Sequence, residues 1–446
     1  MDNDSINIKI EESEGRRKKA GRKKSRSFSF GNIFATINSW RVKDRKIGTV
    51  DLPFFFIVTI LLVMGIIMMF SASYAWAIGE GQEGIFYAKR QMAFGLGGLI
   101  AMFILSKIDY HLFNNIAVSG GTYLFALVLL ALVKFTPLGR EYNEARRWLK
   151  IGPVEFQPSE LMKFAIIISF AYLIVSNQGR IKDFKKGLLP FFVLLGPVVF
   201  FLMKQPHLSC TIIICAIGLI LIYIGGARLK HILAVGFIGA LGLGGVVVYK
   251  IRHEGVTYFI SRFQSWLKPF SDTTDVTWQT DQSLIAIGSG GFFGMGLGNS
   301  RQKFQYLPES KNDFVFSIVC EELGFVGAFT VILLFAFFVF RGFYIASKSP
   351  DKFGMLVCIG ITLQVGLQAF LNIAVVSNFV PNTGISLPFF SYGGTSLLVL
   401  LAEIGVVMNI SRQILETEED IEMEKRAQSI RKARKRARRK AAPKKS

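Results

Sequence analysis

The chain has 446 residues, with 52 Lys and Arg against 31 Asp and Glu, and its net charge of +21 alone would suggest a nucleic-acid-binding protein. However, 51% of the residues are hydrophobic, only 19% are charged and 42 are Phe, which excludes soluble, disordered and collagen-like chains as the main interpretation. Residues 1–50 and 412–446 each contain 13 basic and 6 acidic residues, so the two tails carry 14 of the net positive charges. The apolar body between them predicts an integral membrane protein.

Three parts are expected along the chain: a basic cytoplasmic tail over 1–50, a membrane domain over 51–412 and a second basic cytoplasmic tail over 413–446. No cleavable signal peptide is expected, because the first apolar run follows about 50 polar residues and is long enough to span. Basic segments near a membrane attract anionic lipid head groups. Docking to a cytoplasmic partner is the alternative, and nucleic acid is not expected to bind.

Ten stretches of the body are apolar over roughly the 20 residues that a membrane-spanning helix needs. They lie at about 52–78, 91–106, 115–135, 157–176, 187–203, 209–225, 231–249, 314–340, 353–375 and 391–411. We therefore expect an all-α integral membrane protein with ten transmembrane helices. An even number places both tails on one side, and the positive-inside rule makes that side cytoplasmic. Short basic loops after spans 4, 6 and 8 agree with this N-in, C-in topology.

Two outer loops are basic although the insertion rule disfavours charge there. One covers about 136–156. The other is a large extracytoplasmic loop over about 250–313, between spans 7 and 8. An anionic substrate on the outer face would explain this excess. The alternative is that long loops tolerate charge, which applies less well to the shorter loop. The four Cys and four His show no disulfide framework and no metal-site spacing, so no metal site is predicted.

Charged residues inside or beside the spans are functional candidates, because each costs about 2.5–3.5 kcal/mol at a helix centre. Glu160 and Lys163 at the start of span 4 lie three residues apart, so their side chains are expected on one helix face. They form either a structural ion pair or a pair that also shapes a polar cavity. Asp313, where the large loop meets span 8, is either a helix cap or a functional carboxylate. Glu403 in span 10 has no assigned partner.

Two glycine-rich runs lie next to these positions. The run 287–298 does not match GxGxxG and lies outside the cell in this topology, so we reject a nucleotide loop and expect close approach of backbone to backbone or ligand. The run 391–396, SYGGTS, follows Pro381 and Pro388 in the last outer loop. It predicts a rigid, bent re-entry into the membrane.

Three motifs, QPSELMK, LPESKNDFVFSIVCEELGFVG and NTGISLPFFSYGGTS, resemble the SEDS family (shape, elongation, division and sporulation) of FtsW, RodA and SpoVE. The resemblance covers residues 50–412, and GLGNSRQK with YLPES is more similar to the division and sporulation branch. It implies a ten-helix peptidoglycan glycosyltransferase of the bacterial cytoplasmic membrane, positioned at the division septum. Such an enzyme polymerises lipid II on the outer face and releases undecaprenyl diphosphate.

The resemblance also implies site residues. Asp313, in NDFVF, matches the essential acidic residue of the family, and we expect it to act as the general base of an inverting transfer. The expected substrate-binding residues are Arg90, Arg146, Arg147, Glu160, Lys163, Lys303, Ser391, Gly393, Gly394 and Thr395. The positive groups among them are expected to stabilise the departing diphosphate. No cofactor is evident, although a divalent cation that shares the diphosphate charge is compatible with this chemistry.

One position departs from the family pattern. His207 in QPHLSC stands where the family commonly has Asp, so it donates hydrogen bonds, makes the site pH-sensitive, or marks a lost role. The resemblance further implies a class B penicillin-binding protein transpeptidase and other divisome membrane proteins as partners. Two rival functions stay open: a flippase for the lipid-linked precursor, and a non-catalytic scaffold of the division machinery, for which Asp313 would be dispensable.

Overall fold

The computed structural model describes residues 49–142, 145–152, 154–253, 262–263, 265–271, 275–414 and 422. The chain divides into two compact units, Met1–Asp44 and Arg45–Ser446. The first unit and almost all of the C-terminal tail lie outside the described residues. The predicted tail boundaries at 50 and 413 therefore stay predictions, and the description below concerns the second unit alone.

Helices occupy all ten predicted positions of the membrane body. They are α3 (Leu52–Gly79), α4 (Phe86–Leu105), α5 (Ile116–Phe135), α6 (Pro158–Ser176), α7 (Leu189–Lys204), α8 (Leu208–Gly225), α9 (Leu229–His253), α12 (Val315–Ser347), α13 (Lys352–Val376) and a last helix, Gly394–Ile414. Short turns η1 (Tyr110–Phe113) and η2 (Phe184–Leu188) precede α5 and α7. Within the described ranges, nine helices are long and apolar enough to cross a membrane, and α9 is not among these nine.

Local chemistry sets where several helices begin. The Asp51 carboxylate accepts a hydrogen bond from the Phe54 amide at 2.9 Å and caps α3, and the Asp351 carboxylate caps α13 in the same way. Pro158 stands in the first turn of α6, where its missing N–H is not needed. These capping residues and the proline set the N-terminal ends of helices whose interiors are almost uniformly apolar.

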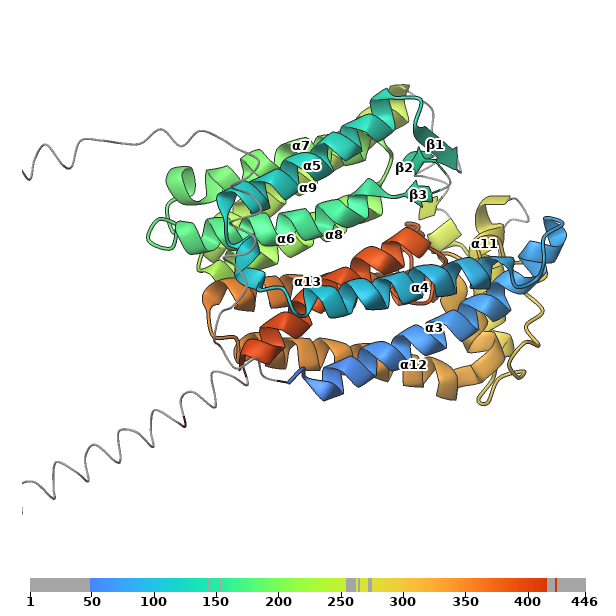
Figure 1. Cartoon of the computed structure of the whole chain (residues 1–446). Helices are drawn as coiled ribbons and strands as arrows, with labels where there is room; N and C mark the ends of the chain where they lie inside the picture. The colour runs from blue at the N-terminus through green and yellow to red at the C-terminus, as the bar shows by residue number, and fades with distance from the viewer. Residues whose placement is uncertain are drawn as a thin grey trace, which may run out of the picture. The chain divides into compact units, whose positions relative to one another are not determined.

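The all-α prediction was wrong for the outer loop 136–156. It contains a three-stranded antiparallel sheet in the order β1 (Gly139–Tyr142), β2 (Ala145–Ile151) and β3 (Val154–Phe156). The last two strands turn at Gly152, whose φ of 61° suits glycine. Figure 1 shows the sheet at the same end of the helices as α11 (Asp275–Ser289), which lies within the large loop.

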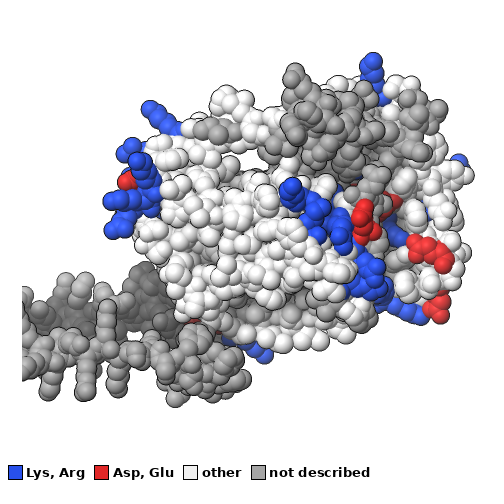
Figure 2. Space-filling view, turned by 90° about the horizontal axis from the view of Figure 1, so that it is seen from above, with Lys and Arg blue, Asp and Glu red and all other residues white. Residues whose placement is uncertain are grey.

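The surface of the helices is apolar where a bilayer would cover it. Large side chains such as Phe125 and Phe337 are 59% and 58% exposed, whereas Phe170 and Phe338 are fully buried between helices. Figure 2 shows Lys and Arg gathered toward the two ends of the visible face, with a band free of charged side chains between them. The described part of the chain is therefore that of a multi-pass membrane protein.

The glycine-rich run closes against a break in α12, which packs on α3 and α13. The helix is interrupted at Gly324, with φ of 66° and ψ of −164°. Amides of Met295 and Gly296 donate to the carbonyls of Glu321 and Glu322 at 2.9 and 3.0 Å. A Cβ on Gly294 would lie 2.2 Å from the Glu322 carbonyl oxygen. The predicted close approach of backbone to backbone is thus confirmed, and it positions the start of α12.

Candidate active site

Asp313 lies directly before α12, at the end of the helices that also carries the sheet and α11. Its side chain is partly buried and faces the last outer loop, because a Cβ built on Gly384 would lie 3.2 Å from Oδ2 of Asp313. Gly384 also has a φ of +67°, which favours glycine. The residue that N-caps α12 is Phe314, which makes no side-chain cap. Asp313 therefore does not serve as the helix cap that the sequence left open.

The surroundings of Asp313 favour its protonated form more than water does. Burial is the main cause and the negative charge of Glu309 adds to it, while Arg147 and Arg262 act in the opposite direction. The net effect raises the pKa of Asp313 from 3.8 to about 6. Such a carboxyl is mostly ionised at neutral pH, yet it is a stronger base than an ordinary aspartate. This combination is what a general base requires.

The two arginines of the ARRW segment diverge, because neighbouring side chains on a strand point to opposite faces. Arg146 donates to the carbonyl oxygens of Thr136 and Gly139 at 3.2 and 2.9 Å, within its own loop. Arg147 instead donates to the Pro206 carbonyl, and its charge acts on Asp313. Its Nε is buried without a hydrogen-bond partner. Of the pair, Arg147 is the one whose charge acts on Asp313.

His207 lies beside Arg147 at the start of α8. Its Nδ1 accepts a hydrogen bond from the Cys210 amide at 3.3 Å, and the Gln157 side-chain amide lies 2.8 Å from its Nε2. Burial, together with the positive charges of Arg147 and Lys163, lowers the pKa of His207 to about 3. The imidazole is therefore neutral at physiological pH and caps α8, so the structure does not support the pH-sensitive alternative.

At the start of α6, Glu160 and Lys163 form the predicted ion pair. The two side chains meet at 2.9 Å, and Lys163, which is 2% exposed, also donates to Oε1 of Gln368 on α13 at 3.0 Å. One turn further along α13, Gln364 donates to Glu403 at 2.7 Å, which supplies the partner that the sequence did not assign. The two pairs lie between helices, and among the described residues Oε1 of Gln364 and Oε1 of Glu403 are buried without a hydrogen-bond partner.

The SYGGTS segment joins loops rather than presenting free polar groups. The Ser391 hydroxyl donates to the Asn312 carbonyl at 2.6 Å, and the Thr395 hydroxyl donates to the Glu155 carbonyl at 2.9 Å. The Gly393 amide donates to Gln91 at 3.2 Å. A Cβ on Gly394 would lie 2.1 Å from the ring of Phe94, so this glycine permits close packing. The predicted rigid re-entry agrees with these contacts.

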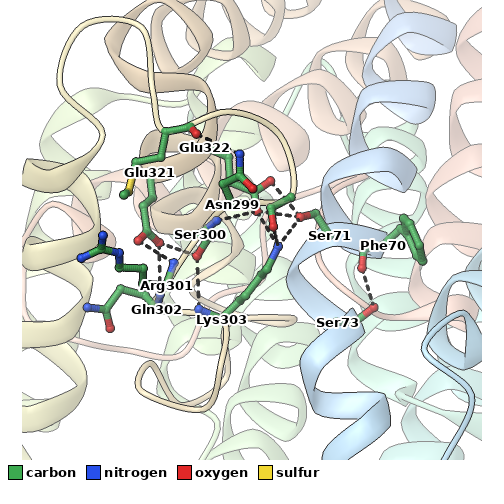
Figure 3. A network of polar contacts seen from close by, with 12 residues as sticks. Phe70, Ser71, Ser73, Asn299, Ser300, Arg301, Gln302, Lys303, Glu321 and Glu322 are labelled. Atoms are coloured by element: carbon green, nitrogen blue, oxygen red, sulfur yellow. Dashed lines mark hydrogen bonds and ion pairs between the residues drawn. The ribbon is translucent and has the colours of Figure 1, made fainter.

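Arg90 and Lys303 are placed differently from each other. Arg90 is exposed in the first turns of α4, with its guanidinium 5.5 Å from the Phe86 ring centre. Lys303 is 3% exposed and pairs with Glu322 at 3.0 Å. Figure 3 shows this network, in which Lys303 and Glu322 also contact Ser71. Lys303 therefore anchors the glycine-rich loop to α3 and α12.

The structure thus brings Asp313, Arg147, His207 and Lys163 into one electrostatic neighbourhood and separates Arg146 and Lys303 from it. Three residues that act on Asp313 or bond its backbone were not predicted as site residues: Arg262, Glu309 and Asn372. Arg262 comes from the large loop, where it donates to the Asn382 carbonyl at 2.8 Å. Its only sequence signal is that it belongs to the unusual outer basic residues.

Asn372 lies on α13, four and eight residues after Gln368 and Gln364, so the three amides share one face of that helix. That polar spacing within an apolar span is the signal by which the sequence could have revealed it. Among the residues described, there is no cluster of three or more His, Cys, Asp or Glu that could hold a metal ion.

Comparison with known proteins decides the family. A family model for FtsW, RodA and SpoVE, described as "Cell cycle protein", matches residues 52–416. The chain belongs to the FtsW/RodA/SpoVE family. The predicted resemblance over 50–412 is confirmed.

Relatives agree along almost their whole length. The chain is 39% identical over 362 residues to "Stage V sporulation protein E" of Bacillus subtilis, covering 81% of this chain and 97% of that protein. It is 35% identical over 370 residues to "Probable peptidoglycan glycosyltransferase FtsW" of Geobacter sp. (strain M18), covering 83% and 99%. Both names belong to the division and sporulation branch that the sequence favoured.

Solved structures share the fold. One is a chain from "Structural coordination of polymerization and crosslinking by a peptidoglycan synthase complex", with a TM-score of 0.67, 27% identity and coverage of 81% of this chain and 98% of that chain. The other is the rod shape determining protein RodA of Thermus thermophilus, with a TM-score of 0.59, 27% identity and coverage of 81% and 97%. The family fold therefore extends over the whole described membrane body.

Proposed function

We propose that the chain is a peptidoglycan glycosyltransferase that polymerises lipid II on the outer face of the cytoplasmic membrane and releases undecaprenyl diphosphate. Relatives that carry this enzyme name match more than four fifths of the chain. The observation that carries the proposal is the partly buried Asp313, with a pKa raised to about 6 and with Arg147 and Arg262 acting on it. A base and positive groups in one place are what this transfer needs.

The reaction can be written on these residues. The 4-hydroxyl oxygen of the acceptor sugar attacks the anomeric carbon of the donor while the bond from that carbon to the diphosphate breaks, which inverts the α linkage to β. The hydroxyl proton passes to the Asp313 carboxylate, which loses it to water before the next turnover. Arg147 and Arg262 stabilise the negative charge of the departing diphosphate, with exposed Arg90 as a further contact.

Two predicted groups receive narrower roles. Lys163 supports the site from behind it, between the helices, and Glu160 pairs with it at 2.9 Å. Ser391, Gly393, Gly394 and Thr395 shape the rim of the site by joining its loops. A divalent cation that assists the diphosphate would have to be held mainly by the substrate, because the described residues offer it no acidic or histidine cluster. No step in the proposed reaction depends on such a cation.

We further propose ten spans with both tails in the cytoplasm. The nine apolar helices together with α9, which fills the seventh predicted position, support this number. The gathering of Lys and Arg toward the two ends seen in Figure 2 fits cytoplasmic basic loops on one side and a basic substrate face on the other. In this topology Asp313, the sheet and α11 all lie outside.

For partners, we propose a class B penicillin-binding protein transpeptidase, other divisome membrane proteins, and anionic lipids at the tails. The similarity to a chain of a peptidoglycan synthase complex supports the first of these. The names of the division and sporulation relatives support action at the septum. Fluorescent labelling in cells should place the protein at the septum together with its partner transpeptidase.

Purified protein, with and without the partner transpeptidase, should be incubated with labelled lipid II in detergent, where no membrane needs to be crossed. The expected product is a glycan polymer whose glycosidic bonds survive mild acid, which cleaves only its terminal lipid diphosphate linkage. A flippase would instead move lipid II across vesicles without making polymer. A scaffold would do neither, and either result would contradict the proposal.

A further inference from the structure

The segment 310–313, which ends at Asp313, is fixed residue by residue from four different parts of the fold. It lies outside any helix, in the turns that precede α12. A short loop with that position would ordinarily be free to move. Here the anchors come from α3, α4, the last outer loop and α13.

The first anchor acts on Ser310 and Lys311. Trp76 of α3 donates from its indole N–H to the Ser310 hydroxyl at 2.8 Å. The Lys311 ammonium group donates to Glu80 at 3.1 Å and to the Tyr87 hydroxyl oxygen at 2.9 Å. It also lies 4.0 Å from the centre of the Tyr87 ring and 5.0 Å from that of Trp76. An ion pair and two cation–π contacts therefore hold this side chain.

The second anchor holds the backbone of the segment. The Tyr392 amide donates to the Lys311 carbonyl at 2.8 Å, and the Ser391 hydroxyl donates to the Asn312 carbonyl at 2.6 Å. Asn372, which is fully buried on α13, donates from one amide nitrogen to the Asp313 carbonyl at 2.7 Å and to the Ile385 carbonyl at 2.6 Å. Asn372 thereby ties Asp313 to the loop that carries Gly384.

We propose that Lys311 and Asn372 are positioning residues for the glycosyl transfer: the aromatic and acidic cage around Lys311 and the forked donation from Asn372 hold Asp313 at the place where it meets the acceptor hydroxyl. The inference rests on the proposed role of Asp313. In this proposal neither Lys311 nor Asn372 touches the substrate. The physical basis is that misplacement of a reacting group by about 1 Å can cost roughly a hundredfold in rate.

The charges around Asp313 allow this role to be separated from a direct electrostatic one. Glu309 raises the pKa of Asp313, and Arg147 and Arg262 lower it. Removing the positive charge of Lys311 would, by charge alone, move the pKa of Asp313 up. Releasing Asp313 toward water would move that pKa down, toward its ordinary value. The acid limb of the pH–rate profile therefore moves in opposite directions in the two cases.

The test measures kcat, KM and the pH–rate profile of lipid II polymerisation for Lys311→Met, Lys311→Arg and Asn372→Leu. We expect Lys311→Met and Asn372→Leu to lower kcat about tenfold or more, with little change in KM, and to move the acid limb to lower pH. Lys311→Arg keeps the ion pair and the cation–π contacts and should restore the parental profile. Lys89→Met, which removes an exposed lysine of α4 that pairs with Glu83 at 2.6 Å, is the matched control and should behave as the parent.

Parental kcat and an unmoved acid limb in both Lys311→Met and Asn372→Leu would overturn the inference. An acid limb that moves to higher pH in Lys311→Met would also overturn it, because Lys311 would then act through its charge. If Asn372→Leu fails to fold, the kcat and the acid limb of Lys311→Met, compared with those of Lys311→Arg, still decide whether Lys311 positions Asp313. If Asp313→Asn kept the parental rate, the proposed function of Asp313 itself would fail, which is a different result.

Discussion

At the scale of single residues, burial and three neighbouring charges set the pKa of Asp313. Burial disfavours the charged form of the carboxyl group and raises its pKa. Glu309, four residues earlier, raises it further because it adds a like charge. Arg147 and Arg262 keep the group from becoming fully protonated. The balance leaves a base that is ionised above about pH 6 and is tuned by two arginines that also suit a diphosphate.

The first prediction concerns Glu309. Asp313 must be ionised to accept a proton, so the rate should fall as the pH drops through about 6. Glu309→Gln removes a like charge, lowers the pKa of Asp313 and should move that acid limb to lower pH, while the amide still accepts the hydrogen bond from Asn312. Rates from about pH 5 to 8 measure the shift. A limb that stays in place would mean that Asp313 is not the group that titrates.

A second prediction compares the neighbouring arginines. Arg147→Ala should lower kcat/KM for lipid II about 10- to 100-fold, because it removes a charged contact from the site. Arg146→Ala should lower it less than about threefold, because that side chain binds carbonyls of its own loop. Initial polymerisation rates of the two purified variants give the comparison. Equal losses would contradict the alternation of the strand.

At the scale of elements, the bilayer made the helices predictable and the outer segments unpredictable. A span needs about 20 apolar residues whatever packs around it, so each predicted stretch contains a helix. The sheet over 139–156 was missed because its strands are short and themselves contain charged residues. Arg262 and Asn372 were missed because their roles depend on long-range contacts, with Asn382 and with the Asp313 carbonyl.

The break in α12 gives a third prediction. Gly324 has a φ of 66°, and a Cβ there would lie 2.2 Å from the Gly294 amide nitrogen. Gly324→Ala should therefore lower the thermal stability of the purified protein, since backbone strain of about 1–3 kcal/mol adds to a steric clash. Gly120→Ala in α5 is the control, because nothing lies within 4 Å of its added Cβ. If both variants had the parental Tm, the close packing of the glycine-rich run would be wrong.

At the scale of the whole molecule, an ionic cluster joins the helix ends that lie opposite the sheet and Asp313. His111, before α5, lies between Asp109 at 2.7 Å and Asp351, at the start of α13, at 3.2 Å. Gln413, in the last helix, also donates to Asp109 at 3.0 Å. Hydrogen bonds to these two carboxylates raise the pKa of His111 from 6.5 to about 9. The cluster therefore connects two loops and the end of the last helix in one charged network.

The fourth prediction follows from linkage. Because the folded-state pKa of His111 is above its ordinary value, the stabilisation is fully present below about pH 6.5 and is lost as the pH rises through about 9. Thermal unfolding in detergent should therefore show a Tm that falls over this range. His111→Gln should flatten that dependence. A parental slope in His111→Gln would contradict the role of the cluster.

The net charge of +21 also has a distribution at this scale. Most of it lies in the tails, and the remainder includes Arg147 and Arg262, whose charges act on Asp313. The sequence predicted Asp313, Arg147 and the Glu160–Lys163 pair because charge is conspicuous in an apolar chain. It could not show that Arg146 bonds carbonyls of its own loop or that Lys303 pairs with Glu322, because residue type alone does not show which way a side chain points.

The most direct test of the account is the rate of lipid II polymerisation by purified Asp313→Asn in the presence of the partner transpeptidase. The amide keeps the shape of the carboxyl group but cannot accept the acceptor's proton, so the rate should fall about 10²- to 10⁴-fold while lipid II still binds. A rate equal to that of the parent would show that Asp313 is not the base.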